Sequence, residues 1–234
     1  MRVADFIAKK FRLLGVTHAY MVTGGAAMHL NDAISREYYQ NLHFFHHEQS
    51  CSMAAEAYAR ITNKPSLVNV TAGPGAINAI NGVFGAYVDS LPMIVISGQS
   101  KRQTLALNSG VNHLRQLGDQ EVNIIEMVSN VCKSAFLLQD PLDIDIIVNQ
   151  AFLLATSGRP GPVWIDIPID VQASILPEHY TSLLTVNTSS AINLNETSSF
   201  SSEDMKELAF RLLTEERPIL YVGNGVRLSD SYSE

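Results

Sequence analysis

Apolar positions follow two different spacings along most of the chain. Segments with apolar residues three and four positions apart predict helices, because that spacing lies on one helix face. Shorter, nearly continuous apolar runs predict strands that are covered on both sides. The predicted helices are residues 2–14, 28–37, 49–61, 76–88, 123–132 and 140–158. The predicted strands are residues 17–22, 42–46, 66–71, 92–98, 133–138 and 161–168.

Strands and helices alternate through roughly residues 1–172, and residues 99–120 interrupt them with a polar, irregular stretch. Alternation of this kind is typical of parallel sheets, whose strands are joined by crossover helices. The pattern therefore predicts an α/β fold: a doubly wound, mostly parallel sheet with helices on both faces.

The composition changes after this first domain. Residues 173–200 are rich in Ser, Thr and Asn without any periodicity, which predicts a linker. Ser201 or Ser202 is positioned to cap a helix through Leu213, and residues 218–225 predict a strand followed by a glycine turn. Residues 201–234 are thus expected to begin a second, central α/β domain. One helix and one strand bury too little surface to be stable alone, so we expect the chain to be truncated or to depend on another chain.

Overall composition narrows the class of protein. Hydrophobic residues make up 46% and charged residues 17%, which is enough for a sizeable core. The net charge of -7 disfavours nucleic acid as a partner, because phosphate binding needs a basic face. Two cysteines form neither a disulfide framework nor a zinc site. No segment approaches the roughly 20 apolar residues of a membrane helix, and the first helix does not resemble a signal peptide. We expect a cytoplasmic protein with no membrane partner.

Three short loops follow predicted strands and carry candidate chemistry. They read "TGGAA" (23–27), "HEQ" (47–49) and "AGPGAIN" (72–78). In a doubly wound sheet these loops lie at the carboxyl ends of strands, where ligands bind. Glu48 offers a carboxylate, and Asn78 offers both a donor and an acceptor. Together with the glycines, which permit close approach of the backbone, these groups suit a planar heterocycle.

Other interpretations of these loops remain open at this point. Glycine-rich turns are common without a ligand, and a glutamate at a helix start stabilises the helix dipole. His46, His47 and Glu48 do not predict a metal site, because neighbouring residues on a strand point to opposite faces. Incomplete dinucleotide fingerprints at "GPGAIN" and "GNGVRL" make a nicotinamide-dependent dehydrogenase a distant alternative.

Long blocks of the sequence resemble a known family. "YMVTGGAAMHLNDAI", the segment from "HHEQSC" through "TAGPGAIN" to "VISGQ", and "SGRPGPVWIDIPIDVQ" are similar to the N-terminal pyrimidine-binding domain of thiamine diphosphate-dependent enzymes. The acetolactate synthase large subunit is the nearest pattern. The resemblance covers about residues 1–172 in order and continues weakly into 217–228.

The resemblance implies roles for particular residues. Glu48 matches the catalytic glutamate, which hydrogen-bonds N1′ of the aminopyrimidine and favours the imino tautomer that removes the thiazolium proton. Gln120 matches a second catalytic position near the substrate. The expected cofactor-binding residues are Gly24, Gly25, Ala26, Glu48, Thr71, Gly73, Pro74 and Asn78.

The resemblance also implies an activity and its partners. A transferase or lyase of this family decarboxylates a 2-keto acid and joins the product to a second carbonyl (carboligation). Thiamine diphosphate is the expected cofactor, and no residue here is expected to bind metal, because the Mg²⁺ ligands belong to a domain that this sequence lacks. FAD would also bind elsewhere, and nothing in these residues supports it. A homodimer or higher homo-oligomer is also expected. The predicted helix after Glu48 has a face of mostly small residues that could pack against a second subunit or, equally well, inside one chain. That face comprises Cys51, Ala54, Ala55, Tyr58 and Ala59.

Two departures from the family pattern bear on the substrate. Val22 and Thr23 replace an aromatic residue and a proline, and Asp119 stands where acetolactate synthases usually have phenylalanine. These changes favour a relative with another acceptor, or a simple decarboxylase. The isolated chain is expected to be inactive. A subunit of a split enzyme and a non-catalytic interaction module of the same fold are the alternatives.

Overall fold

The structure is a computed structural model that describes residues 1–184 and 201–229. It divides into two compact units, Met1–Ala191 and Ile192–Glu234, and each is described here by itself.

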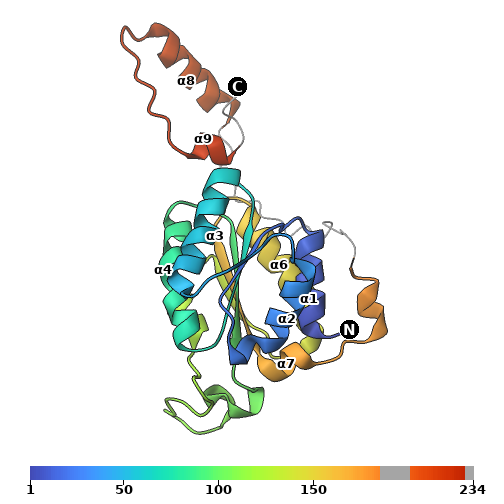
Figure 1. Cartoon of the computed structure of the whole chain (residues 1–234). Coiled ribbons are helices and arrows are strands. Elements are labelled where there is room, and N and C mark those ends of the chain that lie inside the picture. The colour runs from blue at the N-terminus through green and yellow to red at the C-terminus, as the bar shows by residue number, and fades with distance from the viewer. Residues whose placement is uncertain (185–200, 230–234) are drawn as a thin grey trace. The chain divides into compact units, whose positions relative to one another are not determined.

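Within the described residues, the first unit is built on a six-stranded parallel sheet with the order β2-β1-β3-β4-β6-β5 (Figure 1). The prediction of a doubly wound α/β fold is therefore confirmed, and every pair of neighbouring strands is parallel. The strands are β1 (Ala19–Met21), β2 (Leu42–Phe44), β3 (Ser66–Val70), β4 (Met93–Gln99), β5 (Ser134–Leu137) and β6 (Pro162–Pro168).

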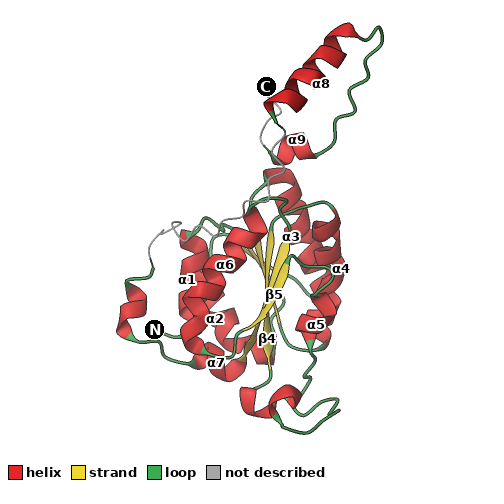
Figure 2. Cartoon of the chain, turned by 180° about the vertical axis from the view of Figure 1, so that it is seen from behind, coloured by secondary structure: helices red, strands yellow, loops and turns green. Residues whose placement is uncertain are grey.

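Helices cover both faces of this sheet, as Figure 2 shows from behind. One face packs against α1 (Val3–Leu13), α2 (Met28–Glu37), α6 (Ile144–Thr156) and α7 (Ile169–Ala173). The other packs against α3 (Glu48–Thr62), α4 (Pro74–Val88) and α5 (Ile124–Val128). Each layer has its own apolar core, because the central strands are buried on both sides.

The predicted elements shift at several ends. Helix α3 starts at Glu48, which places this carboxylate in the first turn of the helix. The segment 140–158 forms a short 3-10 turn, Pro141–Asp143, before α6, and Asp140 caps that turn by accepting from the Leu142 N–H at 2.9 Å. The irregular segment after β4 holds two further 3-10 turns, Arg102–Thr104 and Ala106–Asn108.

Helices α3 and α4 approach each other closely at Gly82. A Cβ atom at Gly82 would lie 2.5 Å from the backbone nitrogen of Met53. On α3, Cys51, Ala55 and Ala59 are buried within the chain, so this part of the small-residue face packs intramolecularly. The outward side of α4 instead presents exposed apolar side chains at helical spacing: Ile77, Phe84 and Val88.

The segment after α7 returns to the N-terminus of the chain. Arg2 and Ile175 form an isolated antiparallel bridge, and the Leu176 N–H donates to the Met1 carbonyl at 2.9 Å. Tyr180 in the 3-10 turn Glu178–Thr181 packs edge-on against Phe6. Residues 185–200, most of the expected linker, lie outside the described residues, and the boundary at residue 172 stays a prediction.

The second unit contains α8 (Ser202–Thr214) and α9 (Gly225–Leu228). The predicted cap is present, since the Ser201 hydroxyl accepts from the Asp204 N–H at 3.1 Å. The strand predicted within 218–225 is wrong: its described residues form no strand and Tyr221 is 97% exposed. A strand needs a neighbouring backbone for its hydrogen bonds, and the described part of this unit offers none.

Two features are absent from the described residues. No helix there is both long and apolar enough to cross a bilayer. Within the same residues, no three His, Cys, Asp or Glu side chains are grouped so that they could hold a metal ion.

Candidate functional site

The strand order of the sheet reverses between β1 and β3. From β1 the chain leaves through α2 toward β2, and from β3 it leaves through α4 toward β4, on the opposite face. The carboxyl ends of the strands at such a reversal are where α/β proteins bind ligands. The three loops predicted from the sequence approach one another at this edge of the sheet.

Glu48 and Asn78 form the polar centre of the site. The Asn78 side-chain amide donates to Glu48 Oε2 at 2.9 Å and lies 3.3 Å from His47 Nε2. Among the described residues, Glu48 Oε1 accepts no hydrogen bond from protein, and the residue is half-buried. The carboxylate is therefore held in place through one oxygen while the other is available to a ligand.

The glycines bring the surrounding backbone close to Glu48. A Cβ atom at Gly75 would lie 2.8 Å from Thr71 Cγ2 and 3.3 Å from Glu48 Oε1. At Gly24 a Cβ atom would lie 2.3 Å from Thr71 Cβ, so only glycine permits this contact between the first and third loops. Thr71 thus joins the β1 loop to the start of α4.

Gln120 reaches the same region through its backbone. A Cβ atom at Gly73 would lie 2.4 Å from the Gln120 carbonyl oxygen, and Gly73 has a φ of 60°, a conformation that favours glycine. Gln120 itself is exposed, with a φ of 53°. The segment after β4 therefore adjoins the loop that precedes α4.

The remaining predicted residues lie around this centre without contacting Glu48. Pro74 is the first residue of α4 and is exposed. Gly25 begins the 3-10 turn after β1, and a Cβ atom there would meet nothing within 4 Å. The Ala26 carbonyl accepts from the Gln172 side chain at 2.8 Å, which anchors the turn to α7.

Two side-chain amides that the sequence interpretation missed support the first loop: Asn69, which is buried, and Asn31, which is half-buried. Asn69 on β3 donates to Asn31 Oδ1 at 2.7 Å, and Asn31 donates to the Gly24 carbonyl at 3.1 Å. One feature of the sequence could have indicated this network: an asparagine lies inside a mostly apolar strand, and a buried amide requires hydrogen-bond partners.

A second polar group, also missed, lies where β4 and β6 end. Ser97 donates to Asp166 Oδ1 at 2.5 Å, and Gln99 donates to Asp166 Oδ2 at 2.8 Å. Trp164 donates its indole N–H to Ser97 Oγ at 2.8 Å. Burial raises the pKa of Asp166 to about 7, and the two donated hydrogen bonds offset part of that effect. The sequence feature that could have indicated this group is the presence of three polar residues, Ser97, Gln99 and Asp166, in two otherwise apolar strands.

The first site fits an aminopyrimidine by the chemistry of its groups. One carboxylate oxygen without a protein donor can accept from a ring N–H, and the adjacent glycines leave room for a flat ring beside it. The groups at this site can therefore receive a flat heterocycle that carries a ring N–H.

Comparison with known proteins agrees with this chemistry. Residues 1–127 match the family model "Thiamine pyrophosphate enzyme, N-terminal TPP binding domain". The chain belongs to this family.

Its relatives include the probable acetolactate synthase 2 of Oryza sativa subsp. japonica, a chloroplastic protein, which is 32% identical over 97% of this chain and 32% of its own length. The acetolactate synthase large subunit of Buchnera aphidicola is 33% identical over 99% of this chain and 38% of its own length. The chain thus spans about a third of the length of the curated relatives it matches.

A solved structure supports the fold. The thiamine diphosphate-dependent 4-hydroxybenzoylformate decarboxylase of Rhodococcus jostii RHA1 superposes with a TM-score of 0.80 at 21% identity. That likeness covers 100% of this chain and 41% of the solved one.

Proposed function

We propose that the chain is the pyrimidine-binding, N-terminal part of a thiamine diphosphate-dependent enzyme that decarboxylates a 2-keto acid and transfers the product to a second carbonyl. The observation that carries this proposal is the Glu48–Asn78 pair at the carboxyl edge of the sheet. The similarity to acetolactate synthases over nearly the whole chain supports the reaction class.

Each residue has a role that follows from its position. Glu48 would hold the aminopyrimidine ring of the cofactor through its carboxylate and would accept a proton from it, while Asn78 orients that carboxylate through Oε2. Thr71 and the glycines beside it shape the wall against the ring, and Gln120 adjoins the site from the segment after β4. When bound, the cofactor supplies the carbanion chemistry, and the protein supplies orientation and proton placement.

The diphosphate requires groups that we place outside these residues. Its charge needs a Mg²⁺ ion or cationic side chains, and the described residues contain no cluster that could hold a metal. We therefore propose that Mg²⁺ is bound by another part of the enzyme, and that residues 1–234 alone do not turn over substrate. No described residue argues for FAD.

A second copy of the chain is the proposed partner of α4. Ile77, Phe84 and Val88 form an apolar strip on its outward side, and Phe84 is 53% exposed. Exposed apolar strips of this kind commonly mark interaction surfaces. The strip lies on the helix that begins at Pro74, next to the Glu48 site, so a copy seated there would also shield the cofactor.

The test is turnover of pyruvate and of an aromatic 2-keto acid by the natural protein in full length, with thiamine diphosphate and Mg²⁺. Glu48→Gln should lower kcat by about 100-fold or more, because it removes the proton-holding carboxylate. Glu56→Gln is the matched control: it lies on the same helix and contacts Arg60 instead of the site. It should leave kcat unchanged.

The outcomes separate the alternatives. Loss of turnover in the Glu48 variant alone supports the proposal. Full activity in that variant would refute the role of Glu48. Absence of any 2-keto acid turnover in the parent protein, together with undiminished partner binding by Glu48→Gln, would instead indicate the non-catalytic module.

A further inference from the structure

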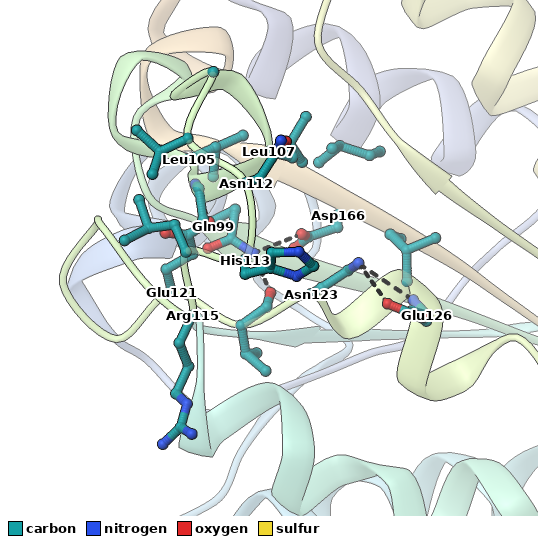
Figure 3. Close-up of a pocket in the computed structure, with 17 residues that line it drawn as sticks. Gln99, Leu105, Leu107, Asn112, His113, Arg115, Glu121, Asn123, Glu126 and Asp166 are labelled. Carbon is teal, nitrogen blue, oxygen red and sulfur yellow. Dashed lines mark hydrogen bonds between the residues drawn. The ribbon is translucent and has the colours of Figure 1, made fainter.

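A second cavity lies at the same edge of the sheet, near the ends of β4, β5 and β6. Its volume is about 470 Å³, within the range of small-molecule sites. Figure 3 shows the residues that line it, which come mainly from the segment after β4. None of the residues around Glu48 lines it, so it is a different site from the proposed pyrimidine site.

The topology explains why a hollow forms here. The chain leaves β4 toward α5 on one face of the sheet and leaves β6 toward α7 on the other. Since β4 and β6 are neighbours in the sheet, their connections diverge to opposite faces here, which we call the β4–β6 switch point, although β6 leads to no further strand in the described residues. A crevice between diverging connections is the place where α/β proteins bind ligands.

The inner wall of the cavity is rich in hydrogen-bond acceptors. Asp166 is 1% exposed and contacts neutral donors only, from Ser97 and Gln99. Each of its oxygens accepts one of these bonds, which leaves further lone pairs for a ligand. A buried carboxylate without a cationic partner would gain from a positively charged or donating group.

The other charged groups that line the cavity do not reverse its preference for a positively charged or hydrogen-bond-donating group. The carboxylate of Glu121 is used by the loop, accepting from Ala106, Leu117 and Gly118. Glu126 accepts from the Asn123 amide at 3.0 Å. Figure 3 shows the guanidinium of Arg115 pointing away from the other labelled residues. The interior is therefore electronegative, which disfavours carboxylates and phosphates.

The mouth of the cavity combines apolar surface with open polar groups. Leu107 and Val111 line it and are 57% and 60% exposed. Leu105 and Leu137 extend the apolar wall. His113 also lines the cavity, and its ring makes no hydrogen bond with any described residue. A ligand here would meet apolar contacts and the His113 ring before reaching the acceptors.

We propose that this cavity binds a small organic amine: an ammonium group directed to the Asp166 end and a short apolar body against the leucines. The complementary charge, the apolar wall and the switch-point position together carry this inference. It does not depend on the proposed catalytic function, and its test needs no turnover.

The test uses three probes with one apolar body: benzylamine, benzyl alcohol and benzoate. Trp164 is the single tryptophan of the chain, and its indole N–H donates to Ser97, which in turn donates to Asp166. The indole signal in ¹H–¹⁵N spectra of the 234-residue chain therefore reports on the Asp166 end. Benzylamine should shift this signal saturably and bind at least about tenfold tighter than benzoate, a difference of about 1.4 kcal/mol.

Two variants test the assignment of residues. Ala106→Phe places a ring in the cavity and should abolish the benzylamine shift while the spectrum stays folded. Asp166→Asn should remove the preference for amine over alcohol. Asp89→Asn, on the exposed end of α4, is the charge-matched control and should behave as the parent.

Each result bears on the proposal. Equal binding of all three probes, tighter binding of benzoate, or no saturable shift at 10 mM probe (about ten-thousandfold above a Kd of about 1 μM) would overturn it. If Asp166→Asn unfolds, the Ala106→Phe variant alone decides: an unchanged benzylamine shift there would place the amine outside the cavity.

Discussion

Two carboxylates at the carboxyl edge of the sheet lie in contrasting surroundings. Glu48 is half-buried, accepts one amide hydrogen bond and keeps an oxygen for a ligand. Asp166 is buried among neutral donors, and its pKa is raised to about 7. The first arrangement suits proton exchange with a bound ring, whereas the second makes Asp166 sensitive to pH near neutrality.

We predict that Asp166 makes the folded chain less stable as pH rises from about 4 to about 7. An aspartate in the unfolded chain has a pKa near 3.9. In this interval the native state therefore holds more protons than the unfolded state, and the free energy of unfolding falls with pH. The free energy of unfolding falls by about 4 kcal/mol at most, and the full decrease is reached above pH 7.

The measurement is urea unfolding of the parent and of Asp166→Asn between pH 4 and 8. Other groups titrate equally in both proteins, so the difference between the two curves isolates Asp166. The variant should gain stability relative to the parent as pH increases. A difference that stays constant across this range would contradict the prediction.

At this scale, the sequence identified residues that follow strands and left out those inside strands. Glu48 and Asn78 could be named because each lies in the first turns of a helix that follows a strand, and Thr71 was named from the family resemblance. Asn69 and Asp166 could not be given roles, because their partners lie 38 and 69 positions away and only the folded sheet brings them together. Whether the named residues bind cofactor stays a prediction.

The close contact of α3 with α4 fixes the site at the level of elements. Glu48 begins one of these helices, and Asn78 lies in the first turns of the other. The 2.9 Å hydrogen bond between them requires that the two helices keep their separation. Gly82 permits that separation, because a side chain there would contact the backbone of α3.

We predict opposite effects for two glycine substitutions on α4. Gly82→Ala should destabilise the chain by about 1–3 kcal/mol, because its methyl group would lie 2.5 Å from Ser52 and Met53 backbone atoms. Gly85→Ala should stabilise it by roughly 0.5–1 kcal/mol, because its methyl group would meet only Glu56 at 3.8 Å. Thermal unfolding of both variants checks this, and similar shifts in Tm would contradict it.

Elements of the first unit were predictable because their apolar spacing is strong. The four inner strands are buried throughout, as their spacing implies, whereas the edge strands β2 and β5 are less buried than it implies. The strand predicted within 218–225 failed for a reason that spacing does not show. Its apolar residues suit a strand, but a strand also needs a neighbour, and Ile219 is 92% exposed in the described structure. The short helix α7 was missed because five residues give too little periodicity.

Among the described residues, exposed apolar side chains gather along two helices. One group is the strip on α4, and the other is on α8, none of whose side chains is buried. Folding of a single soluble chain ordinarily covers such surfaces, so both are candidates for contact with further protein.

For the α4 strip, we predict that Phe84→Glu shifts the protein toward the monomer. A charge at the centre of an apolar interface is costly to bury, and Phe84 is exposed in the single chain, so folding should not suffer. Light scattering after size exclusion measures the mass. Ile146→Glu on α6, at a comparably exposed position, is the control. A parent protein that is already monomeric would refute the proposed partner.

The strand order also has a consequence for how the chain is made. Strand β6 lies between β4 and β5, and it pairs Pro162 with Met93, 69 positions earlier. During synthesis, one edge of β4 therefore stays unpaired after it leaves the ribosome, until about seventy more residues have been made and β6 can pair with it. At about 5–20 residues per second, that interval lasts several seconds. An apolar strand exposed for so long invites pairing with another nascent chain, so we expect soluble yield to fall when translation outpaces chaperone supply.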